Sequence, residues 1–343
     1  MTVAPAARLS CLTEARDLVG PALRGAVYRL PEPARLIAGY HLGWWDEHGQ
    51  PVDGDSGKAI RAALVLLAAR AVGGSPAAAV PAAVAVELVH NFSLLHDDVM
   101  DGDRMRRGRA ASWSVFGSAE AILTGDAMLS LAFSVLSEAD ARAGGRERGL
   151  PMLMKAVFEL VEGQGQDLAF EKRADVTLAE CLAMASGKTA SLLACASGLG
   201  ALFGGGEPSR IEALQRFGRD LGLAFQLVDD LLGIWGDPQR TGKPAGADLF
   251  SRKKSLPVVA ALMNDSAAAD ELARLYLSTK LLGADEVARA AGLVEEAGGR
   301  RWASREAEKY LRAAASHMHA VQPDPEAADE LLRLTQLLAR RDK

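Results

Sequence analysis

Apolar positions along this chain recur at helical spacing and almost nowhere with the alternation of a β-strand. Alanine- and leucine-rich segments of roughly 15 to 28 residues are separated by short stretches that contain glycine and proline. This pattern predicts long helices over six segments: 58–72, 77–100, 118–143, 151–171, 178–202 and 208–235. The segment 77–100 is apolar on nearly all sides until its C-terminal end, so we expect it at the centre of the fold.

The breaks between these segments are short, which favours antiparallel neighbours in one bundle. No internal repeat, low-complexity linker or shift in composition marks a domain boundary. We therefore predict an all-α fold, a single large antiparallel helical bundle over residues 1–343, with about the first 20 residues mobile. The alternative is a pair of smaller helical domains that meet near Gly204. It ranks second because the polar motifs on either side of Gly204 look like halves of one site.

The composition is that of a chain with a sizeable core: 49% of the 343 residues are hydrophobic and 24% are charged. The net charge of −5 supplies no positive field for nucleic acid, so an anionic ligand must be bound by local basic residues or through a metal. The three cysteines show no metal or disulfide spacing. Charged residues from Arg8 to Asp17 interrupt any signal peptide, and no stretch approaches about 18 apolar residues. We therefore expect a cytoplasmic protein without a membrane span.

An acidic motif ends the apolar segment 77–100. Asp97 and Asp101 are four residues apart and share a helix face, while Asp98 lies about 100° round the helix. Bare carboxylates at the end of a buried helix repel one another and oppose the helix dipole. A cation removes both problems. Oxygen ligands alone suit Mg²⁺, which takes substrate phosphates as further ligands.

A second acidic motif ends the segment 208–235. Asp229 and Asp230 form another adjacent pair, and Asp237 follows two turns after Asp229. One such pair is weak evidence, because a solvated helix end also explains it. Two pairs about 130 residues apart on long apolar helices are stronger evidence. Facing each other across a bundle, they would hold metal ions and a diphosphate between them.

Basic residues precede or follow the acidic motifs. Arginine binds phosphate through two parallel donors, and lysine supplies a compact charge. Cations that alternate with carboxylates are what metal-bridged polyphosphates require, and an aromatic content of only 5% argues against a nucleic-acid surface. The basic positions are Lys58, Arg61, Arg104, Arg106, Arg107, Arg109, Lys188, Lys243, Arg252, Lys253 and Lys254.

With these motifs the chain resembles the trans-type isoprenyl diphosphate synthases of isoprenoid biosynthesis, over roughly residues 57–257, and among them bacterial and archaeal geranylgeranyl diphosphate synthases. The resemblance implies an isoprenoid synthase fold with a central substrate cavity. It implies that Asp97, Asp101 and Asp229 ligate Mg²⁺ bridged to the allylic diphosphate. Asp98 and Asp230 would assist them. About three Mg²⁺ ions would bind each site, and Mn²⁺ would substitute for them.

The resemblance also assigns the polar residues to two diphosphate pockets. Isopentenyl diphosphate would be bound by Lys58, Arg61, His90 and Arg107. The allylic diphosphate would be contacted by Arg106, Lys188, Thr189, Gln226, Lys243 and Lys253. His90 could otherwise be a satisfied core histidine, but it lies seven residues before Asp97 on the same helix face.

Two motifs depart from the family's pattern. The basic motif, usually Gly-Gly-Lys-Arg-x-Arg-Pro, here reads Ser56-Gly57-Lys58-Ala59-Ile60-Arg61-Ala62, so one arginine and the proline are missing. The second acidic motif usually ends in aspartate and here ends in Gly233. The site therefore has fewer binding residues than the family's usual pattern, but Lys58, Arg61 and Asp229 remain.

The reaction that these residues suit is ionisation, condensation and elimination with dimethylallyl, geranyl or farnesyl diphosphate as the prenyl donor. Mg²⁺ and the cations Arg106, Lys188 and Lys243 would stabilise the departing diphosphate, and the double bond of isopentenyl diphosphate would attack the allylic cation. A terpene cyclase would not need the second diphosphate pocket. Non-catalytic subunits of heteromeric synthases typically lose an acidic motif, whereas this chain keeps both pairs. A His-Asp phosphohydrolase needs additional ligand histidines, and none of the six here is clearly paired elsewhere in the chain.

Bulky side chains on the helix that leads to Asp97 should limit product length. Ser93 is small and leaves its level open, whereas Phe92, about 7.5 Å from Asp97 along the helix axis, is the first large candidate. Ordinary core packing is the alternative role of Phe92. An aromatic residue there resembles archaeal-type members that make the C20 product, so we expect geranylgeranyl diphosphate, with farnesyl diphosphate second. We also expect a homodimer, by resemblance and because broad apolar helix faces commonly associate.

Overall fold

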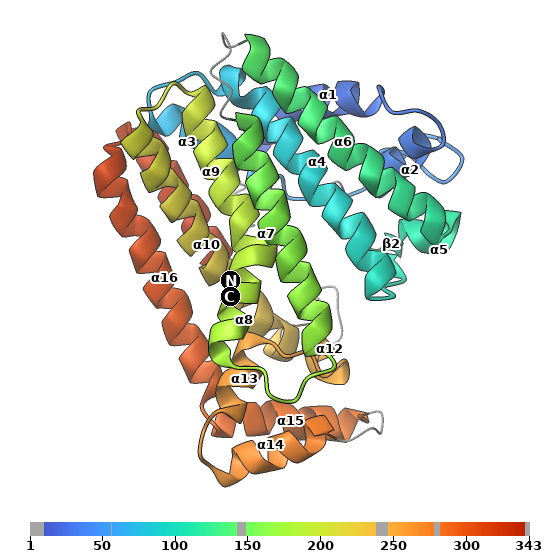
Figure 1. The fold of residues 1–343 in the computed structure, drawn as a ribbon, viewed down its shortest axis with the longest axis vertical. Helices are drawn as coiled ribbons and strands as arrows, with labels where there is room; N and C mark the ends of the chain where they lie inside the picture. Colours follow the sequence, from blue (N-terminus) through green and yellow to red (C-terminus); the bar gives the residue numbers. More distant parts are fainter. Residues whose placement is uncertain (1–9, 56, 143–148, 238–245, 278–281, 340–343) are drawn as a thin grey trace, which may run out of the picture. The chain divides into compact units, whose positions relative to one another are not determined.

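The computed structural model describes residues 10–55, 57–142, 149–237, 246–277 and 282–339 (Figure 1). The chain groups into two compact units that interleave along the sequence. Unit 1 comprises residues 1–155, 195–215 and 320–331, and unit 2 comprises residues 156–194, 216–319 and 332–343. Several long helices therefore contribute residues to both units. The assignment of the whole chain to one domain stays a prediction.

The prediction of an all-α fold is confirmed. The six predicted segments correspond to α3 (Ile60–Ala71), α4 (Pro76–Met100), α6 (Ser118–Arg142), α7 (Gly149–Phe170), α8 (Leu178–Ala185) with α9 (Ser191–Phe203), and α10 (Pro208–Trp235). One segment differs from its prediction, because the π-helical turn η1 (Ser186–Ala190) separates α8 from α9. Strand structure in the described residues is limited to a short hairpin and an isolated bridge between Trp45 and Pro51.

In unit 1, α4 has the central place that its all-round apolar sequence predicts. The helices α1 (Ser10–Val27), α3 and α6 all pack against it, and α4 and α6 lie side by side (Figure 1). The helix α2 (Ala34–His41) packs against α6. From Ser10 onward, the segment predicted to be mobile is a helix that buries Cys11, Ala15 and Val19.

A two-residue hairpin follows α4 and leads into the short helix α5 (Ser112–Phe116). Its strands β1 (Met105–Arg106) and β2 (Arg109–Ala110) are antiparallel, with Arg106 opposite Arg109. The two residues between the strands have positive φ angles, 51° at Arg107 and 74° at Gly108. Positive φ at both central residues is the requirement of a type I′ turn, so this tight turn fixes the place of Arg107.

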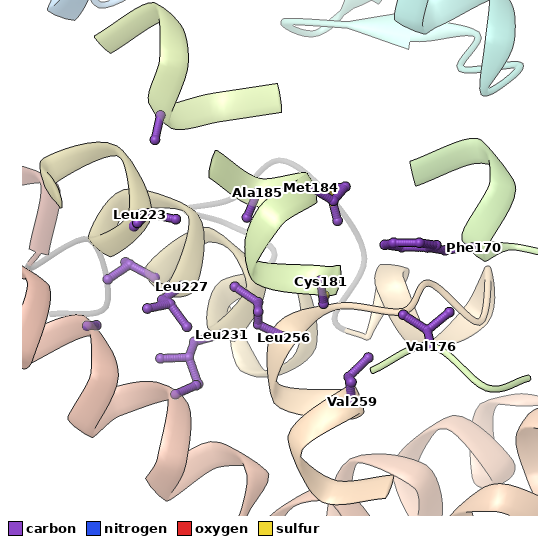
Figure 2. Close-up of a cluster of buried hydrophobic side chains, with 14 residues drawn as sticks. Phe170, Val176, Cys181, Met184, Ala185, Leu223, Leu227, Leu231, Leu256 and Val259 are labelled. Carbon is purple, nitrogen blue, oxygen red and sulfur yellow. The ribbon is translucent and has the colours of Figure 1, made fainter. Parts of the chain in front are cut away.

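In unit 2, one hydrophobic cluster joins α8, α10, α13 (Leu256–Leu262) and α16 (Gly299–Val321) (Figure 2). Its members include Phe170, Cys181, Leu227, Leu231 and Leu256. A second cluster packs α12 (Ala247–Phe250), α14 (Ala267–Leu277) and α15 (Ala284–Glu296) around α13. The last helix, α17 (Pro325–Ala339), contributes residues to both units. These clusters hold the segments that carry the second acidic motif and Lys253.

Two of the described helices, α4 and α6, are long and apolar enough to cross a membrane by length and composition. Of their most apolar windows, 67% in α4 and 44% in α6 is buried inside the protein. The core helix of a globular protein passes the same test, so this finding is weak evidence for a membrane span. The cytoplasmic location stays a prediction.

Candidate active site

The first acidic motif lies at the C-terminal end of α4, where its three aspartates have different surroundings. Asp98 is 1% exposed, whereas Asp97 is partly exposed and Asp101 is exposed. This division follows from the helix, because Asp98 is rotated away from the face that Asp97 and Asp101 share. A metal ion or a phosphate can therefore reach the carboxylates of Asp97 and Asp101.

The buried Asp98 binds Arg106 of the hairpin. Arg106 Nε donates to Asp98 Oδ1 at 2.9 Å and to Oδ2 at 3.3 Å, and Nη2 also donates to Oδ1. Burial raises the pKa of Asp98, and the bond to Arg106 acts against this rise. The pair therefore anchors the arginine that is predicted to contact the allylic diphosphate, and leaves its Nη1 group for a phosphate oxygen.

A basic group formed by Arg61, His90 and Arg107 lies inside unit 1. Burial holds the pKa of His90 well below its ordinary value, and the guanidinium groups of Arg61 and Arg107 add to this effect. Arg107 also lies against the backbone at Gly57, where a Cβ would be 3.1 Å from Nη2. The structure thus brings together three of the four residues predicted to bind isopentenyl diphosphate. The fourth, Lys58, is exposed just after Gly57.

Glu87 belongs to this region, although the sequence analysis did not single it out. Its Oε1 accepts the Ala62 N–H at 3.0 Å, in the first turn of α3. Burial raises the pKa of Glu87, and the nearby Arg61 opposes the rise. A carboxylate at a helix N-terminus is stabilising, so Glu87 fixes the start of α3 and balances the charge of Arg61. A signal was present, because Glu87 is the one Asp, Glu, Lys or Arg between positions 76 and 96.

The second acidic motif repeats this division between an outer and a buried aspartate. Asp229 is exposed, and Asp230 is 3% exposed. Asp230 Oδ1 accepts from Gln226 Nε2 at 2.8 Å, and Oδ2 accepts from the Leu256 N–H at 2.9 Å. Burial raises the pKa of Asp230 to about 7, against the opposing charge of Lys253. Asp230 therefore ties α10 to the start of α13, while Asp229 is accessible.

The π-helical turn places Lys188 and Thr189 in a polar network of unit 2. Lys188 Nζ donates to Asp167 Oδ2 at 2.6 Å, and Thr189 Oγ1 donates to Gln226 Oε1 at 2.6 Å. The turn can lie this close to α7 because residue 163 is glycine: a Cβ there would overlap the Lys188 backbone nitrogen. Such turns inside helices are frequent at functional sites. Asp167 is a second residue that the sequence analysis missed.

Lys253 is surrounded by acidic side chains of unit 2. Burial alone would lower its pKa, but the carboxylates of Asp248, Asp230, Asp167 and Asp229 outweigh burial and raise it. The ammonium group therefore stays charged next to the second acidic motif. Lys243, also predicted to contact the allylic diphosphate, lies outside the described residues.

In the structure, the space for a side chain at position 233 is already filled. A side chain on Gly233 would overlap the carboxylate of Asp248, which occupies that space. Asp248 lies in the first turn of α12, and it is a third residue that sequence reasoning missed. The space next to Asp229 and Asp230 therefore holds a carboxylate from another helix.

Backbone strain gathers at the predicted basic residues. Among the described non-glycine residues, positive φ angles occur at Ala59, Arg107, Arg252 and Gln322. Ala59 lies between Lys58 and Arg61, Arg107 is itself a predicted ligand, and Arg252 precedes Lys253. Strained backbone of this kind persists where the surrounding structure holds it, and it concentrates at functional sites.

Within the part of the chain that the structure describes, no group of three or more histidine, cysteine or acidic side chains lies close enough together to hold a metal ion. The donors at Asp97, Asp101 and Asp229 are nevertheless of the type that Mg²⁺ prefers, and Mg²⁺ commonly takes only one or two protein carboxylates. The residues present therefore fit a metal that binds together with a diphosphate.

Phe92 and Ser93, the predicted chain-length residues, are both buried on α4. The Phe92 ring meets the His96 ring edge-on at 5.4 Å, and His96 Nε2 lies 3.0 Å from the Ile122 carbonyl oxygen on α6. Ser93 Oγ donates to the His90 carbonyl oxygen at 2.9 Å. Their effect on product length stays a prediction.

Comparisons with known proteins agree with this geometry. The profile of the polyprenyl synthetase family matches residues 45–293. A (2E,6E)-farnesyl diphosphate synthase of Mycobacterium tuberculosis is 50% identical over 306 residues, which cover 88% of this chain and 85% of that protein. A geranylgeranyl diphosphate synthase of the same organism is 48% identical over 331 residues, which cover 96% and 93%.

The crystal structure of a polyprenyl synthetase from Streptomyces coelicolor has a TM-score of 0.91 at 47% identity, covering 96% of this chain and 98% of that one. The family profile, the sequence identities and the shared fold together show that the chain belongs to the polyprenyl synthetase family and is a prenyltransferase of the isoprenyl diphosphate synthase class.

Proposed function

We propose that this prenyltransferase condenses isopentenyl diphosphate with dimethylallyl, geranyl and farnesyl diphosphates, and that its main product is geranylgeranyl diphosphate. The observation that carries the proposal is the basic group of Arg61, His90 and Arg107 in unit 1. Two partly buried guanidinium groups beside a neutral imidazole suit a diphosphate that binds without having to ionise. A terpene cyclase has no use for such a group.

Divalent metal ions are used by this family. We propose Mg²⁺ here, with Asp97, Asp101 and Asp229 as its protein ligands, about three ions per site, and Mn²⁺ as a substitute. When bound, the metal supplies positive charge to the leaving diphosphate. The buried aspartates Asp98 and Asp230 support the outer ones by fixing the helix ends.

The chain's own residues would carry the rest of the chemistry. Arg106 and Lys188 hold the allylic diphosphate and stabilise negative charge as the carbon–oxygen bond breaks. Their acidic partners, Asp98 and Asp167, keep both cations in fixed positions. Gln226 and Thr189 bind one another at 2.6 Å and orient polar oxygens on the same network. Lys58, Arg61, His90 and Arg107 orient isopentenyl diphosphate so that its double bond faces the cation.

We propose that the side chain of Phe92 limits the length of the product. Phe92 is 5% exposed, and its ring contacts His96, whose Nε2 lies 3.0 Å from the Ile122 carbonyl oxygen on α6. The Phe92 ring therefore has little room to move aside. The relatives include both farnesyl and geranylgeranyl diphosphate synthases, which agrees with a short product. A Phe92→Ala variant should release products of C25 or longer. Identical product lengths in variant and wild type would remove Phe92 as the limit.

We propose a homodimer on the basis of exposed apolar side chains. On α6, Ile122 is 41% and Leu123 is 66% exposed. On α7, Met154, Phe158 and Val161 recur at helical spacing and are 39%, 69% and 54% exposed. Apolar patches of this kind mark interaction surfaces. Sedimentation should show a dimer at micromolar concentration, and Phe158→Glu should shift it toward monomer; a monomeric wild type would contradict the proposal.

The experiment that tests the function is incubation of the purified protein with radiolabelled isopentenyl diphosphate, Mg²⁺ and each allylic primer. We expect label in a C20 diphosphate, and no incorporation when EDTA replaces Mg²⁺. Cyclised hydrocarbon or free phosphate without chain elongation would contradict the proposed condensation. A main product of C15 would leave the reaction intact and correct the chain length.

A further inference from the structure

A small, partly open recess lies in unit 1 beside Arg107, among α2, the hairpin and the start of α5. Its lining includes Tyr40 and His41 from α2, Asp55, Arg107, and Ala111 with Ser112. Its volume is about 10 Å³, which suits a single water molecule and is far too small for a phosphate group. This space is therefore no substrate pocket, although it borders a residue of the proposed isopentenyl diphosphate site.

Three polar atoms of its lining residues are buried and have no hydrogen-bond partner in the described part of the chain. They are His41 Nε2, Arg107 Nη1 and Ser112 Oγ. His41 is 7% exposed and Ser112 is 2% exposed, so bulk solvent does not satisfy either group. Buried polar groups without a partner are costly, and proteins commonly satisfy them with an internal water molecule that makes about three hydrogen bonds.

The chemistry of the three groups is complementary to one water. Burial, followed by the charges of Arg107 and Arg106, lowers the pKa of His41 to about 3, and an interaction with the Asn91 side chain only partly opposes this, so the imidazole is neutral at pH 7. A neutral ring nitrogen can accept a hydrogen bond, whereas the Arg107 guanidinium can only donate. A water molecule can donate a hydrogen bond to His41 and accept one from Arg107. It can also either donate to or accept from the Ser112 hydroxyl.

We propose that His41 is a positioning residue for isopentenyl diphosphate, acting on Arg107 through one buried water molecule that Ser112 also binds. The inference rests on the proposed function, in which Arg107 binds that substrate. The turn fixes the Arg107 backbone at φ 51°, and the Gly57 backbone lies against Nη2. The water fixes Nη1, so the guanidinium is held at both ends before the substrate arrives.

Kinetic variants separate this role from a structural one. In His41→Leu the ring nitrogen is lost, and we expect the KM for isopentenyl diphosphate to rise about tenfold while the KM for farnesyl diphosphate stays within about twofold. In His41→Gln a polar atom remains at similar reach, and most of the loss should be recovered. Ser112→Ala should give a smaller rise of the same selectivity. His48→Leu, at an exposed histidine of unit 1, is the matched control and should change neither KM.

The inference is overturned if His41→Leu changes neither KM, changes both equally, or is matched by His41→Gln. Thermal unfolding of each variant checks that the fold is kept, and Ser112→Ala tests the same water if His41→Leu does not fold. Calorimetric titration with isopentenyl diphosphate alone separates the two claims. If the wild type fails to bind it, the proposed function fails; if wild type and His41→Leu bind it equally, only this inference fails. A high-resolution crystal structure should show one water bonded to His41, Arg107 and Ser112, and an empty or apolar contact there would contradict the inference.

Discussion

The two acidic motifs are built on the same plan but anchored by different chemistry. Each places an aspartate pair at the end of an apolar helix, and in each pair the second member is the buried one. Asp98 binds a charged partner, Arg106, eight residues later on the hairpin. Asp230 binds neutral donors, the Gln226 amide and the Leu256 backbone N–H.

The buried carboxylate of each pair therefore has a different structural role. In unit 1 it fixes a side chain that we propose to bind phosphate, because Asp98 holds the Arg106 guanidinium directly. In unit 2 it fixes backbone, because the N–H of Leu256 starts the helix that follows Lys253. The more exposed members, the partly exposed Asp97 and the exposed Asp229, are the ones accessible to metal. A role of Asp98 and Asp230 in assisting the metal ions stays a prediction.

The largest expected effect comes from the exposed members. Asp97→Ala and Asp229→Ala should each lower kcat/KM more than about 100-fold, ~2.7 kcal/mol in barrier, because the charge that neutralises the leaving diphosphate is no longer held. Stability without metal should be unchanged or slightly higher, because a repelling charge is removed. Asp265→Ala, at an exposed aspartate, is the control. Activity of either variant within about tenfold of wild type would refute the assigned ligands.

The buried members should differ in their effect on the free energy of unfolding. Asp98→Asn leaves the Arg106 guanidinium without its counter-charge and should cost about 3 kcal/mol. Asp230→Asn keeps a side chain of the same shape and loses mainly the bond to the Leu256 N–H, so about 1 kcal/mol is expected. Urea unfolding at pH 7 measures both. A larger loss for Asp230→Asn would mean that the two anchors have been ranked the wrong way round.

Two glycines on α7 test the close approach of that helix to the π-helical turn. Gly163→Ala should destabilise the protein by about 2 kcal/mol and lower activity, because the new methyl group overlaps the Lys188 nitrogen. Gly165→Ala meets no atom within 4 Å and should be neutral or stabilising by up to about 1 kcal/mol. Thermal unfolding and kcat of both variants give the comparison. Equal behaviour of the pair would show that the turn does not depend on the missing side chain at 163.

The smallest expected effect is a dependence of stability on pH that arises in unit 1. The pKa of His41 is lowered from 6.5 to about 3 by folding, mainly through burial. The unfolded chain therefore binds a proton more readily, and stability must fall as the pH drops below 6.5. Between pH 7 and pH 5.5 this amounts to about 1 kcal/mol, and His41→Gln should remove it. Denaturant unfolding at the two pH values checks this, and an unchanged pH dependence in the variant would assign the effect to another group.

Much of the fold followed from the sequence because apolar periodicity alone specifies long helices. The ends of α3, α4, α6 and α10 lie close to their predicted places, since glycine, proline or an acidic run punctuates each segment. The aspartate pairs were recognisable because two adjacent charges at the end of an apolar helix need an explanation. Their division into exposed and buried members also follows from the 100° step of the helix.

The remaining features depend on contacts between distant segments. The π-helical turn forms where Gly163 and Gly187 let two helices meet closely, and neither glycine signals that alone. Asp167 binds Lys188, which is 21 positions away in the sequence. Asp248 lies next to Gly233, which is 15 positions away. Glu87 caps α3 from α4, 25 residues away from Ala62. Such pairings are properties of the tertiary structure, and local pattern carries no information about them.

We propose that Arg61, His90 and Arg107 form a pocket for isopentenyl diphosphate separate from the groups that hold the allylic diphosphate. Steady-state kinetics of Arg61→Ala and His90→Ala with both substrates varied tests it most directly. We expect the KM for isopentenyl diphosphate to rise at least about tenfold, ~1.4 kcal/mol, while the KM for the allylic primer changes less than about twofold. An equal rise in both values would contradict it, because the basic group would then serve either substrate.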